Sequence, residues 1–179
     1  MSETDGRLFH RAAELGSAFD RSFAVSTRQD PPLMESLLAI HMGKDACLLR
    51  LAETVGLFMD KKITPVPSRV ATLLGIAGFR GTTLPVYDLH AFLGQTTTEP
   101  PRWLVIAAAA PIALAFQKLD GHLQVPPKDV LSREESQQKR QYVHDFAYVQ
   151  GLVRPIVHLP SILDAIRQQQ TEATRDKER

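Results

Sequence analysis

Cysteine and excess charge of one sign are both scarce in this sequence of 179 residues. A single cysteine, Cys47, excludes a disulfide bond within the chain. Lys and Arg total 21 against 20 Asp and Glu, so the chain lacks the cationic excess that phosphate backbones attract. This balance argues against a general nucleic-acid binder. The chain also shows no charged and apolar leader of the kind that directs secretion, and we expect a cytoplasmic protein.

No apolar run in the sequence is long enough to cross a membrane. The longest extends over residues 103–116 and is interrupted by Pro111, so we expect it to lie in a core and expect no direct membrane insertion. Hydrophobic residues make up 44% of the chain and charged residues 23%, which is the balance of a folded soluble protein. The length suits one ordinary domain or two small ones that share an interface.

Motifs of catalysis and of metal binding are also missing. None of the six histidines pairs with another histidine or with Cys47 at the spacing of metal ligands. No serine stands in a nucleophile elbow, and Gly75, Gly78 and Gly81 match neither a phosphate loop nor a dinucleotide fingerprint. Asp88 is the one carboxylate that directly follows an apolar strand, so no acid and base pair can be named. We predict no catalytic residues, no cofactor and no metal.

The N-terminal segment has the pattern of a helix. Residues 7–25 place apolar side chains at spacings of three and four, and residues 30–32, Asp-Pro-Pro, end the pattern. We therefore predict an N-terminal helical extension over residues 1–34. Two interpretations stay open: the helix packs on the rest of the protein, or it is an arm that binds a partner.

From Ser36 onward the sequence consists of short apolar runs between turn residues, which predicts an all-β protein with short helices. The expected strands are residues 37–42, 46–51, 55–59, 61–66, 75–79, 82–87, 103–108, 112–118, 122–125, 146–150 and 155–159. The expected helices are one turn after Ser68, a second over 89–93 and a longer one over 161–170, while the spacing of Ser132 and Glu135 suits a capping box in a charged loop. Residues 169–179 read as a charged flexible tail.

Two segments of the chain resemble one another. Residues 81–93 and 151–163 match at four positions with a constant offset of 70 residues, and each reads as a glycine turn, a strand with proline and a short helix. Four matches leave chance open, but they suit a duplication into two similar halves, roughly 35–100 and 101–168. Two small barrels would leave few exposed strand edges.

One charged residue stands out inside an apolar segment. Arg80 is followed by Gly81 and preceded by Gly75, Gly78 and Phe79, so its side chain should project from a tight turn. An arginine held in this way suits recognition of a partner surface. The alternative is an internal ion pair with the nearby Asp88.

The residues around this turn carry a family resemblance. Gly75-Ile-Ala-Gly-Phe-Arg80-Gly81, followed by Leu84-Pro85-Val86-Tyr87-Asp88-Leu89, resembles the signature of the CheW-like domain. The likeness continues upstream over residues 38–47 and downstream over 103–125 and 146–163. It implies two five-stranded SH3-like barrels over residues 35–168, with N-terminal and C-terminal helices added.

The resemblance also implies a function and a set of site residues. Proteins of this family are non-enzymatic adaptors of bacterial chemosensory arrays, which couple the tips of methyl-accepting chemoreceptors to the regulatory domain of a CheA-type histidine kinase. The receptor tip docks in the groove between the barrels, and apolar patches on barrel edges contact the kinase. Arg80 is the expected receptor-facing residue, with Gly75 and Gly81 shaping its turn. Phe79 and Gly56 complete the predicted partner-binding set.

Several residues depart from the family pattern. Gly78 stands where asparagine is common, Gly56 stands where an acidic residue is common, and Gln117 and His158 replace aspartates of the second half. These departures suggest a divergent member that serves an alternative pathway such as surface motility.

Two other functions remain as alternatives. One is a scaffold of the same fold for another regulator outside receptor arrays. The other is a small-barrel nucleic-acid binder, for which Phe58, Lys61 and Lys62 would supply the aromatic and basic side chains.

Overall fold

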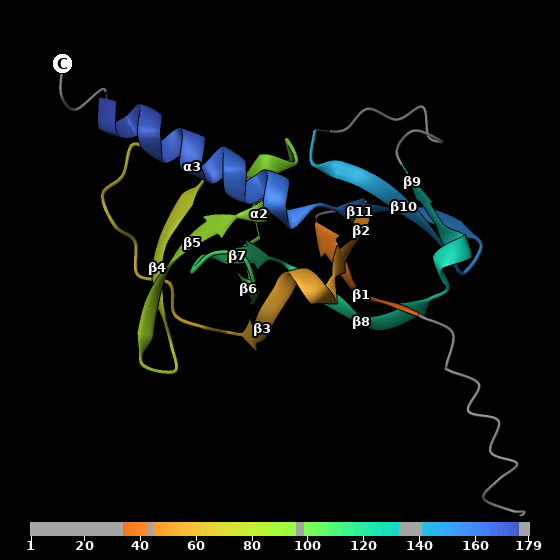
Figure 1. Cartoon of the computed structure of the whole chain (residues 1–179). Coiled ribbons are helices and arrows are strands. Elements are labelled where there is room, and N and C mark those ends of the chain that lie inside the picture. The colour runs from red at the N-terminus through yellow and green to blue at the C-terminus, as the bar shows by residue number, and fades with distance from the viewer. Residues whose placement is uncertain (1–33, 43–44, 96–98, 133–140, 176–179) are drawn as a thin grey trace, which may run out of the picture. The chain divides into compact units, whose positions relative to one another are not determined.

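The computed structural model describes residues 34–42, 45–95, 99–132 and 141–175 (Figure 1). The predicted N-terminal helix and the predicted capping box at Ser132 and Glu135 therefore lie outside the described residues, wholly or in part.

The described chain is mostly β-structure, as the sequence predicts. The strands are β1 (Glu35–Met42), β2 (Asp45–Arg50), β3 (Thr54–Met59), β4 (Leu73–Phe79), β5 (Thr82–Asp88), β6 (Trp103–Ala107), β7 (Ala113–Phe116), β8 (Lys118–Val125), β9 (Val130–Ser132), β10 (Val143–Val149) and β11 (Leu152–Val157). The helices are α2 (Leu89–Phe92) and α3 (Leu159–Arg175), with the short 3-10 turns η1 (Leu51–Glu53) and η2 (Pro127–Asp129).

Two predicted elements do not form as expected. The strand expected over 61–66 is reduced to one isolated bridge between Thr64 and Ile76, because prolines at 65 and 67 remove two backbone donors. The helical turn expected after Ser68 does not form, and the Ser68 hydroxyl accepts a single hydrogen bond from the backbone N–H of Val70, at 3.0 Å.

The strands form two sheets. Sheet A has six strands in the order β8-β1-β2-β11-β10-β9, and sheet B has five in the order β3-β6-β7-β5-β4. All neighbouring pairs are antiparallel except β2 with β11 and β5 with β7. The ladders do not close either sheet, so the predicted pair of closed five-stranded barrels is not what the hydrogen bonds form. Edge strands β3 and β4 of sheet B instead approach one another through side chains, with the Phe58 and Phe79 ring centroids 4.9 Å apart.

The repeat suspected from the sequence is visible in the backbone. Hairpins β4–β5 and β10–β11 both turn on two residues with positive φ, Arg80-Gly81 (45° and 87°) and Gln150-Gly151 (52° and 81°). Positive φ at both central residues is what a type I′ hairpin turn requires. Each hairpin is then followed by a helix and pairs in parallel with a strand of another hairpin, β7 or β2.

The two sheets do not follow the predicted division at residue 100. Hairpin β1–β2 from the first half of the chain lies in sheet A beside β11, a strand of the second half. Hairpin β6–β7 from the second half lies in sheet B beside β5, a strand of the first half. The first hairpin of each half is thus part of the sheet formed by the other half. The chain crosses from sheet A to sheet B at η1 and returns at Gln117.

The core explains this exchange. The exchanged hairpins are apolar on both faces: Leu37 and Ala39 face the interior of sheet A, whereas Leu38 and Ile40 face a core shared by both sheets. In β6, Leu104 faces the interior of sheet B and Val105 the shared core. A strand with two apolar faces is fully buried only between two layers, which also accounts for the unbroken apolar runs in the sequence.

Helix α3 covers the shared core and is longer than predicted. It begins beside β11 and runs over the side of the molecule that carries β4 and β5 (Figure 1). Ile162, Leu163 and Ile166 lie in the shared core. Residues 169–175, expected as a flexible tail, are helical because the Gln169 side chain bonds Thr72 at 2.6 Å and Gln170 bonds the Tyr87 hydroxyl at 2.6 Å.

No helix in the described part of the chain has the length and apolar character needed to cross a bilayer.

Candidate functional site

The predicted key residue, Arg80, lies at the tip of hairpin β4–β5. Its backbone is left-handed, which is uncommon for a residue with a side chain, and its side chain is exposed. Among the described residues, no hydrogen bond or ion pair to the Arg80 guanidinium is present. The turn therefore presents a guanidinium whose donors face solvent.

The alternative of an internal pair between Arg80 and Asp88 is wrong. The two residues stand at opposite ends of β5, about 25 Å apart for extended strand geometry. The Asp88 carboxylate instead caps α2: its Oδ1 accepts from the backbone N–H of His90 at 2.9 Å and lies 3.1 Å from His90 Nδ1. Asp88 is therefore a structural cap, and Arg80 is left for an external group.

Beside Arg80 the surface forms an apolar groove of about 350 Å³ at one end of sheet B. It is bounded by β3, by hairpin β4–β5 and by the turn between β6 and β7. Its lining consists of Val55, Phe58, Phe79, Arg80, Thr82, Leu84, Ile106, Ala107, Ala108, Ala110 and Pro111. We call it the Arg80 groove. Arg80 carries the one formal charge in this lining.

Phe58 is part of the groove wall and packs against neighbouring side chains. Its ring meets that of Phe79 edge to face, and the Lys61 ammonium lies 5.5 Å from its centroid. The ring therefore already has an aromatic and a cationic partner within the protein. This arrangement disfavours the nucleic-acid interpretation based on Phe58, Lys61 and Lys62.

The predicted glycines occupy different places. Gly81 is the second residue of the Arg80 turn. Gly56 borders the groove: a Cβ there would lie 2.8 Å from the Phe58 ring and 3.7 Å from the side chain of Ile106. Gly75 is not in the turn. It lies in β4, where a Cβ would stand 2.2 Å from the Thr64 carbonyl oxygen. The structure thus brings Arg80, Phe79, Gly81 and Gly56 together and places Gly75 as a support of β4.

A second, larger cavity of about 550 Å³ opens between sheet A and the helices α2 and α3. Asp45 of β2, Phe92 of α2 and Gln169 of α3 line it, together with Thr72 and Tyr142, which directly precede β4 and β10. Arg80 is absent from this lining. The groove between the halves and the receptor-facing arginine, which the family resemblance implied together, are therefore separate features of this structure.

Sheet A carries an apolar surface that the sequence pattern does not predict. Tyr148 and Val153 pair across hairpin β10–β11, lie on the same face of it and are 53% and 57% exposed. Leu131 of β9 extends the surface, because it pairs with Phe146 two residues before Tyr148. We call these side chains the β10–β11 patch. The offset of 70 residues could have revealed it, since Tyr148 and Val153 correspond to the small Gly78 and Thr83 of the first hairpin.

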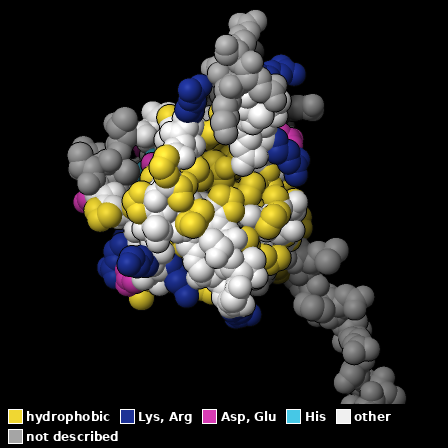
Figure 2. Space-filling model, turned by 90° about the vertical axis from the view of Figure 1, so that its left-hand side faces the viewer, with side chains coloured by type: hydrophobic (Ala, Val, Ile, Leu, Met, Phe, Trp, Pro, Cys, Tyr) yellow, Lys and Arg dark blue, Asp and Glu magenta, His cyan; other side chains and the backbone are white. Residues whose placement is uncertain are grey.

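The side of the molecule that carries β4 also presents apolar surface. Figure 2 shows hydrophobic side chains gathered at the centre of this side, with lysine and arginine side chains towards its margins. Edge strand β4 contributes the half-buried Leu73, Leu74 and Ile76.

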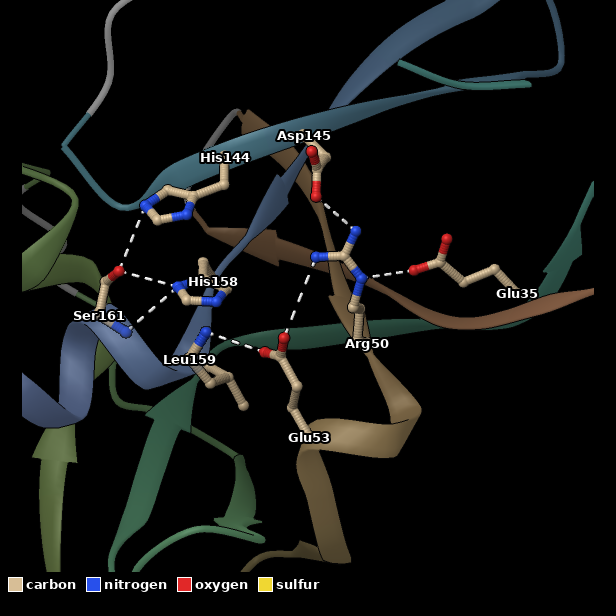
Figure 3. Close-up of polar contacts among 8 residues, drawn as sticks. All are labelled: Glu35, Arg50, Glu53, His144, Asp145, His158, Leu159 and Ser161. Carbon is tan, nitrogen blue, oxygen red and sulfur yellow. Dashed lines mark hydrogen bonds and ion pairs between the residues drawn. The ribbon is translucent and has the colours of Figure 1, made fainter. Parts of the chain in front are cut away.

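A charged cluster surrounds Arg50 where the chain passes from sheet A to sheet B (Figure 3). The guanidinium donates to Glu35 and to Asp145, and Glu53 lies 4.0 Å away. Burial disfavours the charged form, but the hydrogen bonds to Asp145 and Glu35 raise the pKa of Arg50 above its ordinary value. Glu53 is three residues from Arg50, but Glu35 and Asp145 are 15 and 95 residues away, so no sequence spacing predicts their contact with it.

Two carboxylates elsewhere, those of Asp120 and Asp60, form more exposed ion pairs. Partial burial opposes the charge of Asp120, but hydrogen bonds from Lys118 and His41 outweigh it and lower the pKa of that carboxyl. A hydrogen bond from Arg102 lowers the pKa of Asp60. Because their pKa values are lower in the folded than in the unfolded protein, both carboxylates stabilise the folded state at pH values above their unfolded pKa. This stabilisation is lost as the pH falls through their pKa values in the folded protein.

The described residues contain no group of three His, Cys, Asp or Glu side chains placed to hold a metal ion. Their distinctive features are a projecting arginine beside an apolar groove on one sheet and an apolar patch on the other. Such an arrangement is that of a β-sheet scaffold that binds other macromolecules.

Comparison with known proteins identifies the family. The profile of the CheW-like domain matches residues 36–167, and the chain therefore belongs to the CheW-like domain family. The chemotaxis protein CheW of Rhizobium meliloti (strain 1021) is 28% identical over 105 residues, which cover 55% of this chain and 68% of that protein. CheW-like proteins are scaffolds of chemotaxis without catalytic activity, so this protein is not an enzyme.

A solved structure shows the same fold. The crystal structure of the scaffolding protein TtCheW from Thermoanaerobacter tengcongensis superposes with a TM-score of 0.62 at 15% sequence identity. The match covers 70% of this chain and 89% of that one.

Proposed function

We propose that this protein is an adaptor that couples the cytoplasmic tip of a methyl-accepting chemoreceptor to the regulatory domain of a CheA-type histidine kinase, at a cytoplasmic receptor array. The single observation that carries the proposal is Arg80, an exposed guanidinium at the rim of an apolar groove in a chain of the CheW-like family. An adaptor needs two surfaces. The Arg80 groove and the β10–β11 patch supply them.

The Arg80 groove suits the receptor tip. Phe79, Phe58 and Val55 offer apolar area, and Gly56 leaves the wall open where a side chain would collide with the Phe58 ring. Arg80 adds donors that can pair with carboxylates or with the free carbonyls at a helix end. A helical hairpin tip offers both kinds of acceptor beside apolar side chains. The hairpin turn fixes the Arg80 backbone, so less conformational freedom is lost on binding.

The β10–β11 patch suits the kinase. Tyr148 and Val153 are more than half exposed on one face of the hairpin, and an exposed apolar cluster of this kind marks a protein interface. It belongs to sheet A, whereas Arg80 belongs to sheet B, and the two hairpins lie on different sides of the molecule in Figure 1. The two partners can therefore bind at once.

The receptor surface is tested with Arg80→Glu. We expect this charge reversal to weaken binding to a purified receptor fragment by about 2 kcal/mol, or roughly thirtyfold in Kd, because an exposed arginine anchor is replaced by a repelled carboxylate. Thermal unfolding should not change, since the side chain has no described partner. The matched control is Gln150→Glu, which introduces the same residue at the corresponding turn position of the other hairpin. Equal binding by Arg80→Glu and the wild type would remove Arg80 from the site.

The kinase surface is tested with Val153→Glu. A carboxylate at the centre of the β10–β11 patch should weaken binding to the kinase regulatory domain at least tenfold, roughly the effect expected when a charge is left in an apolar contact. Its control is Thr83→Glu, the corresponding exposed position of the first hairpin. If both variants weaken kinase binding equally, the patch is not the kinase surface. Binding to neither receptor nor kinase by the wild type would favour a scaffold for another regulator.

A further inference from the structure

The first turn of α3 has an unusual N-cap. His158 directly precedes the helix, and its Nδ1 accepts from the backbone N–H of Ser161 at 3.3 Å (Figure 3). The N–H of Leu159 donates to Glu53 at 2.9 Å, and Pro160 has no N–H to satisfy. The backbone N–H of His158 donates to the carbonyl of Tyr142 at 2.9 Å. Every backbone donor from His158 to Ser161 is thus paired, and an imidazole takes the part that an N-cap side chain usually plays.

The other half of the chain shows the ordinary version of this cap. Asp88 occupies the corresponding position, 70 residues earlier, and its carboxylate accepts from the N–H of His90 at the start of α2. Aspartate accepts hydrogen bonds at any pH above its acidic range. Histidine accepts only while it is neutral, and its charge changes near physiological pH. The exchange of Asp for His therefore makes the cap of α3 sensitive to protons.

The hydrogen bonds define the proton positions. Nδ1 of His158 accepts from a backbone N–H, so we assign its proton to Nε2. The Ser161 hydroxyl lies 2.8 Å from His158 Nδ1 and 3.2 Å from His144 Nε2, so it donates to the first ring and accepts from the second. The two rings stack, with centroids 4.2 Å apart and an interplanar angle of 14°.

Other charged groups surround the cap, and most of them are paired with a group of opposite charge. Glu53 of η1 contacts the first N–H of α3 and faces the guanidinium of Arg50 in β2. Further out, Asp145 and Glu35 both pair with that guanidinium, and Asp164 of α3 pairs with Arg167. The Glu53 carboxylate is thus shared between Arg50 and a backbone N–H and is only partly available to a charged His158.

We propose that His158 makes the attachment of α3 to the shared core dependent on pH. Protonation at Nδ1 removes the acceptor for the Ser161 N–H and adds a positive charge at the positive end of the helix dipole. The Ser161 N–H keeps this acceptor only while Nδ1 carries no proton, so the stabilisation is lost when acidification protonates the ring. Because Ile162, Leu163 and Ile166 cover the junction of the two sheets, acidification loosens the element that holds the sheets together.

The test is amide hydrogen exchange of the full chain at about pH 7.5 and pH 5.5, either side of the ordinary histidine range, with protection factors corrected for the intrinsic exchange rate. The wild type should lose about fivefold protection at the amides of Ser161 and Ile162 on acidification, the factor that an ordinary N-cap contributes. His158→Asn, whose side-chain oxygen accepts at both pH values, should lose none. His122→Asn, at an exposed position of β8, should behave as the wild type.

Equal protection of the wild type at both pH values would overturn the proposal, as would an equal loss in His158→Asn. Should His158→Asn not fold, His158→Asp restores the cap of the first half and takes its place. A loss of protection in His158→Asp as large as in the wild type would likewise show that another group responds to pH.

Discussion

Replacement of Arg50 by methionine is expected to lower the free energy of unfolding by about 2 kcal/mol. The variant keeps the apolar stem but leaves Glu35, Glu53 and Asp145 close together without their shared cation. Breaking a fully buried ion pair costs more, but these side chains are 17–26% exposed and solvent screens part of the repulsion. The measurement is urea denaturation at neutral pH.

The matched control for Arg50 is Arg102→Met. Arg102 likewise donates two hydrogen bonds, both to the carboxylate of Asp60, but both side chains are more than half exposed. Its loss should leave the urea midpoint unchanged, because surface ion pairs contribute little. Adding Asp145→Asn to Arg50→Met should recover part of the lost stability by removing one of the repelling charges. An Arg50→Met variant as stable as the wild type would show that the cluster does not stabilise the fold.

Gly75→Ala is expected to destabilise the protein by roughly 3 kcal/mol. The backbone there has φ of +146°, and the new Cβ would stand 2.2 Å from the Thr64 carbonyl oxygen, closer than atoms pack. That carbonyl accepts from the N–H of Ile76, so relief of the clash would break the bridge that ties the segment after β3 to β4. Urea denaturation again measures the loss.

Gly78→Ala provides the comparison for Gly75. It lies in the same strand, three residues later, where no atom stands within 4 Å of a Cβ. We expect almost no change in stability there, and we expect receptor binding to be retained by both variants at temperatures where they are folded. A stable Gly75→Ala that had lost receptor binding would instead place Gly75 at the interface.

Much of the fold could be predicted from the sequence because the residues that end its strands act locally. Glycine and proline mark where strands end, and the Arg80-Gly81 and Gln150-Gly151 turns repeat at a fixed offset with the same backbone. The exchange of hairpins between sheets could not be predicted in this way. It depends on which face of β1 or β6 meets which core, and both faces are equally apolar in the sequence.

The candidate site was predictable only in part for a similar reason. Arg80 stands out because a charge among apolar residues and glycines is visible without coordinates. The β10–β11 patch is not visible, because Tyr148 and Val153 look like ordinary strand residues until the sheet shows which face they occupy. The length of α3 was underestimated because Gln169 and Gln170 find partners, Thr72 and Tyr87, that are distant in sequence.

The central claim, that one chain binds receptor and kinase at two separate surfaces, is tested most directly by bridging. A receptor fragment is immobilised, the kinase regulatory domain is added, and retention of the kinase is measured with and without this protein. We predict that the wild type retains the kinase, that Arg80→Glu is lost from the receptor but still binds the kinase in solution, and that Val153→Glu binds the receptor but retains no kinase. Competition between receptor and kinase for the wild-type protein would contradict the account.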